Sequence, residues 1–390
     1  MIRFSGRFAA VGGNTLATQV QEKFFSADGH VIEPADLWTT RLDKRFRDRA
    51  PHVEHGEKCD FFCVDGLQPF AGNDLGGVFA TYKLEGRAID DRKHNRKAEI
   101  RRGAFDPLAR LQDQDIDNLA AEVLYPNDAL FLFGAPDVEY KTACIKAYND
   151  WLAEFCAAAP DRFIGAAMLP LGGPPETVVA ESRRARKMGL RTVMLPAGLP
   201  KIPFGDPYYR LLFAELQDTG TPLSIHNAAS EQQFVPVPAT AGGATVTFLE
   251  NKYVDHFRTL TSMIASGVPQ AFPRLKIVIV EGGIGWVAAI LHTMDHWWED
   301  HHRWLRPHLD EKPSVYCHRQ FYFTFEEDRA GLLTRELLNV DRLMWGSDYP
   351  HTEGTFPRSR EQVAKDFAGL DSGLVSKLVG GNCRRLYGGD

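Results

Sequence analysis

The sequence predicts an α/β protein built as a (β/α)₈ TIM-type barrel with a long insertion after strand one. From residue 24 onward, eight short apolar runs rich in β-branched residues alternate with amphipathic stretches, the pattern of parallel βαβ units. The 390-residue length suits such a barrel with insertions, and a 44% hydrophobic content allows a large core. A doubly wound sheet is the rival fold, but no glycine-rich phosphate fingerprint follows any run.

The strands and helices are expected in strict alternation. We predict strands at 24–31, 122–127, 163–171, 190–197, 222–227, 275–282, 321–325 and 342–349. We predict helices at 140–158, 175–188, 206–218, 251–266, 329–338 and 360–370. Asp206 followed by Pro207 signals a helix start, because it places a cap residue before a proline at the first helical position.

The chain is expected to form one domain with an N-terminal extension. Residues 1–23 contain Arg3 and Arg7 but no apolar stretch with a cleavage signal, which indicates a polar N-terminal arm. Residues 24–390 are predicted to form a single metal-dependent hydrolase-type barrel domain. An insertion at about 45–105 does not fit the repeat, and we interpret it as a lid or a subunit contact.

Three smaller segments need their own interpretation. Cys59 and Cys63 have CxxxC spacing, but no second Cys/His pair follows, so a zinc site is not expected there. The mixed charge run 90–97 is interpreted as a solvated loop. Residues 229–249, rich in Gly, Ala, Pro and Thr, are predicted to form a mobile active-site loop.

Composition excludes several classes of protein. A net charge of −6 gives no reason to expect nucleic acid, and no 18-residue apolar run is present, so no membrane span is expected. Six cysteines in a chain of this size do not form a disulfide framework, so the sequence indicates a cytoplasmic protein. We expect a small-molecule substrate and a homo-oligomer, a dimer or higher, with a hetero-oligomer as the alternative.

Acids and histidines follow four of the predicted strands immediately. In a (β/α)₈ barrel the functional groups lie at the C-terminal ends of the strands, so these side chains should meet at one rim. Unpaired acids crowded together there would repel one another, which favours a bound cation. The candidate metal ligands are Asp28, His30 and Glu33 after strand one, His226 after strand five, Glu281 after strand six and Asp348 after strand eight, with His256 as a further candidate.

This mixture of imidazole and carboxylate suits Zn²⁺, Mn²⁺ or Fe²⁺, and no cysteine falls at the rim. Three protein ligands with open positions would make a site for one catalytic ion, whereas the larger set could hold two. We expect Asp348 to act as a general base as well as a ligand, with His256 or His351 as a proton shuttle. Glu281 is the fourth candidate for a catalytic role.

Several motifs, taken in order, resemble the amidohydrolase superfamily. They are Asp28-Gly29-His30 with Glu33-Pro34, Phe272-Pro273-Arg274-Leu275-Lys276 before Glu281-Gly282-Gly283, Gly346-Ser347-Asp348-Tyr349-Pro350-His351, Tyr148-Asn149-Asp150-Trp151-Leu152, Asp161-Arg162-Phe163 and the terminal Gly381-Asn382-Cys383-Arg384-Arg385-Leu386-Tyr387. The chain is most similar to the amidohydrolase 2 branch, which includes aminocarboxymuconate-semialdehyde and resorcylate-type decarboxylases. The resemblance implies a metal held by the strand-one motif, His226 and Asp348.

The sequence also departs from that family's pattern. Asp28 stands where strand one of the family usually begins a His-x-His motif, and Glu281 stands where the decarboxylases usually carry an acid/base histidine. A carboxylate at this position would need a raised pKa to donate a proton near neutrality, so Glu281 is expected to bind metal instead. Leu195-Pro196-Ala197 ends strand four without a lysine, which does not support a carbamylated-lysine bridge.

Three functions follow from these residues. The first is metal-dependent hydrolysis or non-oxidative decarboxylation of a small substrate that bears a carboxylate or an aromatic ring. The second is oxygenation, because His30-x-x-Glu33 together with Glu281 resembles a family offshoot in which dinuclear iron or manganese–iron sites activate dioxygen to hydroxylate substrates. The third is a barrel that has lost catalysis and serves as a partner subunit. Arg162, Arg191 and Arg358 are candidates to hold a substrate carboxylate, and their spacing does not select among them.

Overall fold

The computed structural model describes residues 22–57, 60–71, 97–198, 200–232 and 237–388. The N-terminal arm up to residue 21, Cys59 and most of the 90–97 charge run lie outside these ranges. In the described part no helix is long and apolar enough to cross a membrane.

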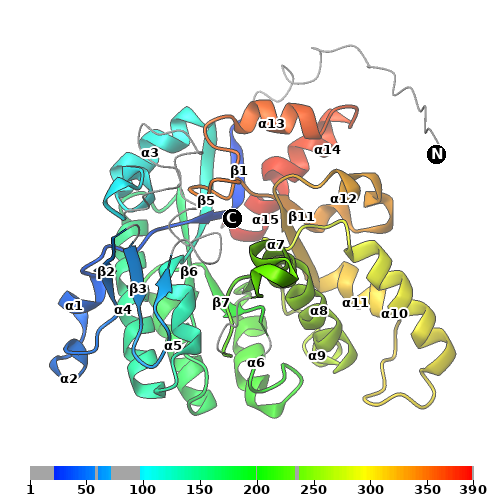
Figure 1. The fold of residues 1–390 in the computed structure, drawn as a ribbon. Coiled ribbons are helices and arrows are strands. Elements are labelled where there is room, and N and C mark those ends of the chain that lie inside the picture. The colour runs from blue at the N-terminus through cyan, green and yellow to red at the C-terminus, as the bar shows by residue number, and fades with distance from the viewer. Residues whose placement is uncertain (1–21, 58–59, 72–96, 199, 233–236, 389–390) are drawn as a thin grey trace.

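Eight parallel strands form the barrel sheet in chain order (Figure 1). They are β1 (Phe24–His30), β5 (Leu119–Tyr125), β6 (Phe163–Met168), β7 (Thr192–Pro196), β8 (Leu223–His226), β9 (Ile277–Val280), β10 (Phe321–Phe325) and β11 (Leu343–Trp345). Each overlaps one predicted strand, and β10 coincides with its predicted range. Most of their residues are buried, as expected for strands covered on both faces. The predicted barrel is confirmed.

Helices connect successive strands on the outside of this sheet (Figure 1). They are α1 (Leu37–Arg41), α2 (Lys44–Arg47), α3 (Pro107–Ile116), α4 (Val138–Ala157), α5 (Pro175–Lys187), α6 (Arg210–Thr219), α7 (Gly243–Leu249), α8 (Asp255–Ala265), α9 (Val268–Ala271), α10 (Val287–His301), α11 (Pro313–Gln320), α12 (Arg329–Leu333), α13 (Ser359–Asp366), α14 (Ser372–Ser376) and α15 (Asn382–Tyr387).

The first and last strands meet just beyond β11. Gly29 and Tyr349 form a parallel bridge, and the backbone amide of His30 donates to the carbonyl of Tyr349 at 2.6 Å. The amide of Asp348 likewise donates to the carbonyl of Asp28 at 3.0 Å. These bonds join the two segments that carry candidate ligands, so closing the barrel also assembles part of the candidate site.

The segment expected as an insertion contains a small antiparallel sheet. It consists of β2 (His52–His55), β3 (Asp60–Cys63) and β4 (Phe70–Ala71), at the left of Figure 1. The rings of Trp38 and Phe62 lie 5.4 Å apart and pack β3 against α1. The Trp38 indole also donates to the carbonyl of Cys144 in α4, which ties this segment to the barrel.

The segment after β8 differs from its prediction. Residues 229–249 were expected to be an irregular loop, but α7 occupies their last part and continues through a π-helical turn, Glu250–Val254, into α8. This helix could not be predicted because it contains residues of low helix propensity, namely Gly243, Thr245 and Val246. It forms because it is continuous with α8. π-Helical turns often occur at functional sites. This one lies beside the loop that follows β9, where a Cβ at Gly283 would lie 3.8 Å from the Tyr253 ring.

Candidate metal centre

Four strand ends bring acids and histidines together at the C-terminal rim of the barrel. Asp28 and His30 lie two residues apart in β1, and His226 is the last residue of β8. Glu281 directly follows β9, and Asp348 follows β11 by three residues. All five are buried, with at most 8% of their surface exposed.

The side chains converge through their metal-ligating atoms. His30 Nε2 lies 3.4 Å from Glu281 Oε2, 3.4 Å from Asp348 Oδ1 and 3.9 Å from Asp28 Oδ1. His226 Nε2 lies 3.5 Å from Glu281 Oε2 and 3.8 Å from Asp28 Oδ1. The candidate ligands form two overlapping groups, one with Asp28 and His226 and one with Asp348 and His351, and both groups contain His30 and Glu281.

One atom of each candidate ligand is buried and makes no hydrogen bond. These atoms are Asp28 Oδ1, His30 Nε2, His226 Nε2, Glu281 Oε2 and Asp348 Oδ2. The opposite ring nitrogens are used, because Nδ1 of His30 contacts the Pro126 carbonyl at 2.9 Å and Nδ1 of His226 contacts its neighbour's carbonyl at 3.0 Å. Each Nδ1 therefore donates to a carbonyl, which directs each Nε2 at the cluster, where it can bind a metal.

The cluster has the size and chemistry of a transition-metal site. Atoms that each lie about 2.1 Å from one ion are separated from each other by roughly 3 to 4 Å, as these are. Five buried polar atoms without partners would cost several kcal/mol if nothing bound them. Each of the two overlapping groups therefore fits a divalent cation.

The electrostatics of the carboxylates point the same way. Burial, and then the charge of Glu281, raise the pKa of Asp348 well above its ordinary value. Burial also opposes charge on Glu281, but His30 and His226 outweigh it and hold the pKa of Glu281 below its usual range. Acids forced this close together either share protons or bind a cation.

Two polar side chains orient the carboxylates. The Thr324 hydroxyl donates to Asp28 Oδ2 at 3.2 Å and accepts the backbone amide of Glu281 at 2.7 Å. The Asn227 amide donates to Glu281 Oε1 at 3.0 Å. Glu281 and Asp348 themselves have left-handed backbones, with φ of 60° and 53°, a strained conformation that non-glycine residues adopt mainly at functional sites.

His351 extends the cluster toward its edge. Its Nδ1 lies 2.8 Å from Asp348 Oδ1, and its Nε2 lies 3.0 Å from the side-chain oxygen of Asn127. Its ring centroid is 4.3 Å from that of His30. His351 therefore couples directly to a candidate ligand and can pass a proton to or from it.

The structure does not bring Glu33 and His256 into the cluster. The Glu33 carboxylate accepts the backbone amides of Asn127, Asp128 and Ala129, where a 3₁₀ helix begins. Burial, together with Asp128, raises the pKa of Glu33 to about 8. Both ring nitrogens of His256 face backbone carbonyls, with Nδ1 2.8 Å from that of Lys252, and burial lowers the pKa of His256 to about 4. The backbone groups that surround these side chains already occupy their polar atoms.

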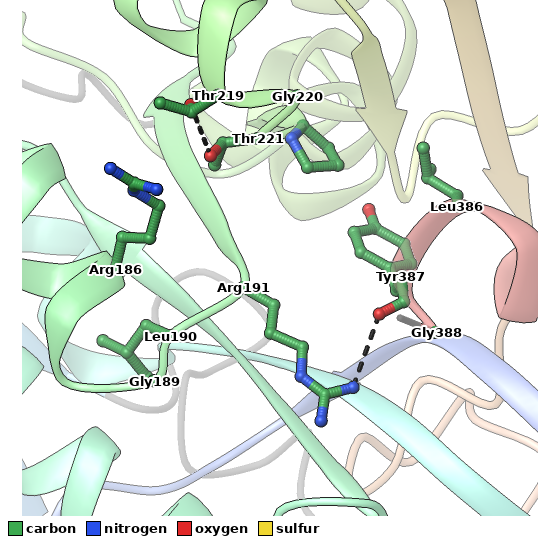
Figure 2. Close-up of a pocket in the computed structure, with 11 residues that line it drawn as sticks. Arg186, Gly189, Leu190, Arg191, Thr219, Gly220, Thr221, Leu386, Tyr387 and Gly388 are labelled. Atoms are coloured by element: carbon green, nitrogen blue, oxygen red, sulfur yellow. Dashed lines mark hydrogen bonds between the residues drawn. The ribbon is translucent and has the colours of Figure 1, made fainter. Parts of the chain in front are cut away.

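The candidate substrate arginines do not line the cluster. Arg162 and Arg191 lie at the other end of the barrel, because they precede β6 and β7, and Arg358 is an exposed residue directly before α13. An open pocket of about 500 Å³ lies between the beginnings of β7 and β8 and the end of α15 (Figure 2). Figure 2 shows Arg191 directed to the carbonyl of Tyr387, to which it donates at 3.4 Å, and Arg191 also donates to Pro160 at 2.7 Å. This pocket contains none of the candidate ligands.

Comparison with known proteins identifies the family. A model of the amidohydrolase family matches residues 52–389. The chain is 26% identical over 264 residues to gamma-resorcylate decarboxylase of Rhodococcus jostii (strain RHA1), a match that covers 62% of this chain and 76% of that one. Its fold is similar to an amidohydrolase from Mycobacterium avium subsp. paratuberculosis K-10, with a TM-score of 0.76 at 21% identity over 95% of this chain and 100% of that one.

A second solved structure with a similar fold contains a bound metal. It is a mutant of 5-carboxyvanillate decarboxylase from Novosphingobium aromaticivorans DSM 12444 with bound manganese and 3-methoxy-4-hydroxy-5-nitrobenzoic acid. The TM-score is 0.71 at 17% identity, over 94% of this chain and 97% of that one. The barrel, the rim cluster and the match over most of the chain lead to one conclusion: this chain belongs to the amidohydrolase family.

Proposed function

We propose that the chain is a divalent-metal-dependent carboxy-lyase that removes a carboxyl group, without oxidation, from a small aromatic or other carboxylate-bearing substrate. The observation that carries the proposal is the set of five buried ligand atoms without hydrogen bonds at the barrel rim. The relatives support decarboxylation over hydrolysis, since gamma-resorcylate decarboxylase is among them.

His30 and Glu281, which belong to both ligand groups, would hold the cation together with Asp28 and His226 or with Asp348. Mn²⁺ is the first candidate because a solved neighbour contains it, and Zn²⁺ and Fe²⁺ suit the same ligands. A bound divalent cation supplies a Lewis acid that polarises a substrate carboxylate or carbonyl.

Decarboxylation replaces a carbon–carboxylate bond with a carbon–hydrogen bond, so the site must deliver one proton to carbon. The Asp348 Oδ1 and His351 Nδ1 pair, 2.8 Å apart, would hold that proton. The depth of the pair limits the access of water to the reacting carbon.

The test is release of CO₂ from gamma-resorcylate and from 5-carboxyvanillate by metal-stripped and Mn²⁺-reconstituted protein, under air and under argon. We expect CO₂ only from the reconstituted protein, at equal rates under both atmospheres. Protein that retains no divalent metal after reconstitution would contradict the proposal and favour a non-catalytic subunit.

One observation favours a second function. The two overlapping ligand groups, which share His30 and Glu281, offer enough donors for two ions and hence for a dinuclear oxygenase. Two metal equivalents that include iron, with product formed only under air, would replace the carboxy-lyase proposal with this one.

A further inference from the structure

A charged pair that the ligand cluster does not use lies beside it. Lys252 belongs to the π-helical turn Glu250–Val254, and Glu326 directly follows β10. Lys252 Nζ and Glu326 Oε1 are 3.9 Å apart, and their side chains are only 18% and 11% exposed. In the described part of the chain neither charged group makes a hydrogen bond. Both can therefore form hydrogen bonds with a ligand, at a place where little water reaches them.

The pair lies above the ligands, toward the mouth of the barrel. Thr324 contacts Asp28, and Glu326 lies two residues further along the same chain direction. Glu326 directly follows β10, two residues beyond Thr324, so it lies nearer the mouth of the barrel than Thr324 does. His256 Nδ1 lies 2.8 Å from the Lys252 carbonyl, and its Nε2 lies 3.4 Å from the carbonyl of Ile225 in β8, which anchors this turn beside β8.

The charge of Lys252 acts on the cluster. Burial opposes that charge, but the carboxylates of Glu326, Glu281 and Asp348 outweigh burial and raise the pKa of Lys252 above its ordinary value. Lys252 is therefore a fixed cation among carboxylates. A fixed cation at this rim attracts an anionic substrate toward the ligand cluster.

We infer that the Lys252 ammonium binds the carboxylate group of the substrate, and that Glu326 is its partner when no substrate is present. The inference rests on the proposed function and adds a substrate-binding residue to it. The Phe248 ring, 5.4 Å from Lys252 Nζ, offers an apolar surface to the ring of an aromatic substrate. Lys252 thus selects substrates by charge, and the ligand cluster carries out the reaction.

The experiment measures binding directly, by calorimetric titration of Mn²⁺-reconstituted protein. The probes are two acids, benzoate and 2,6-dihydroxybenzoate, each paired with its neutral amide. We expect the wild-type protein to prefer each acid over its amide, and Lys252→Met to weaken acid binding about 10- to 100-fold while amide binding stays within about twofold. Glu326→Gln should tighten acid binding, because it removes the competitor for Lys252.

Lys365→Met is the matched control, since Lys365 forms a similar ion pair with Glu327, at 3.7 Å, but both side chains are more than 60% exposed. It should leave all four affinities unchanged. Equal affinities of Lys252→Met and wild type for the acids, or a wild type without preference for them, would overturn the inference. Metal content and CO₂ release of the wild-type protein report on the proposed function separately.

Discussion

His30 Nε2 lies 3.4 Å from Asp348 Oδ1, although the two residues come from opposite ends of the described chain. The contact exists because β1 and the segment after β11 pair through the amide of Asp348 and the carbonyl of Asp28. Closure of the barrel and assembly of the candidate site are therefore one structural event. We call this pairing of residues 28–30 with residues 348–349 the seam. Substitutions at the seam should change both the free energy of unfolding and the affinity for metal.

Gly346 tests the seam directly. A Cβ at this position would lie 2.4 Å from the Cβ of Asp28, so Gly346→Ala must push the two segments apart. We expect a loss of about 2–4 kcal/mol in the free energy of unfolding, measured with urea, and a weaker affinity for Mn²⁺. Gly189→Ala is the control, because Gly189 has a φ of 94° with no atom within 4 Å of a Cβ, so only backbone strain of about 1 kcal/mol is expected. If both variants kept wild-type metal affinity, the seam would have no role in the site.

Thr324 bridges two candidate ligands through one hydroxyl, from Asp28 to the backbone of Glu281. Thr324→Val keeps the shape and the β-branched side chain but removes both hydrogen bonds. We expect about a 10- to 100-fold loss in Mn²⁺ affinity, the usual effect of removing a residue that orients a ligand. Thr324→Ser should restore most of it, since it retains the hydroxyl. Competition with a fluorescent chelator measures each affinity, and a Thr324→Val variant with unchanged affinity would rule out the bridging role.

Arg110 holds the backbone of β1 from inside the protein. Its guanidinium donates to Glu122 Oε2 and to the carbonyl of His30, both at 2.8 Å, and the Arg110 and Glu122 side chains are each 1% exposed. Arg110→Met leaves the Glu122 charge buried without its main partner, so we expect a loss of about 3–5 kcal/mol on urea unfolding. Arg102→Met, which removes a surface ion pair with Asp106, should cost less than about 1 kcal/mol. Equal losses in the two variants would contradict this account.

His256 should make stability depend on pH. Burial lowers the pKa of His256 from 6.5 to about 4. Between these two pH values His256 is protonated in the unfolded chain but neutral in the folded protein. Its contribution is therefore fully present above pH 6.5 and is lost as the pH falls toward 4, by roughly 3 kcal/mol at most. His256→Gln removes this group and should show a shallower decline in unfolding free energy over that interval. Parallel curves for the two proteins would show that His256 does not titrate in this way.

Much of the fold could be predicted, because the buried strands of a parallel barrel are short apolar runs that differ from the amphipathic helices between them. The run Phe321–Phe325 matches β10 residue for residue, since every side chain there is buried. β11 is shorter than predicted because the chain beyond Gly346 turns to pair with β1 through the amide of Asp348, whose backbone is left-handed. A hydrophobic pattern does not predict such a change of backbone conformation. The helix α7 was missed because Gly243, Thr245 and Val246 have low helix propensity.

The candidate site could be predicted less completely. Strand ends located Asp28, His30, His226, Glu281 and Asp348, since the rule for barrel rims depends only on chain position. The same rule also selected Glu33, because it does not consider what a side chain contacts. The Glu33 carboxylate instead accepts backbone amides at the start of a 3₁₀ helix. Thr324, which contacts two candidate ligands, and Lys252, the proposed substrate-binding residue, could not be predicted, because in sequence one is an ordinary strand residue and the other an ordinary charge on a helix.

The most direct test is the metal content of the purified protein, measured by elemental analysis against protein concentration after reconstitution with Mn²⁺. The account predicts at least one equivalent for the wild-type protein and for Asp341→Ala, which removes an exposed acid paired with Lys377. It predicts a loss of most of that metal in Asp348→Ala, together with loss of activity. Full metal occupancy and activity in Asp348→Ala would contradict the proposed centre.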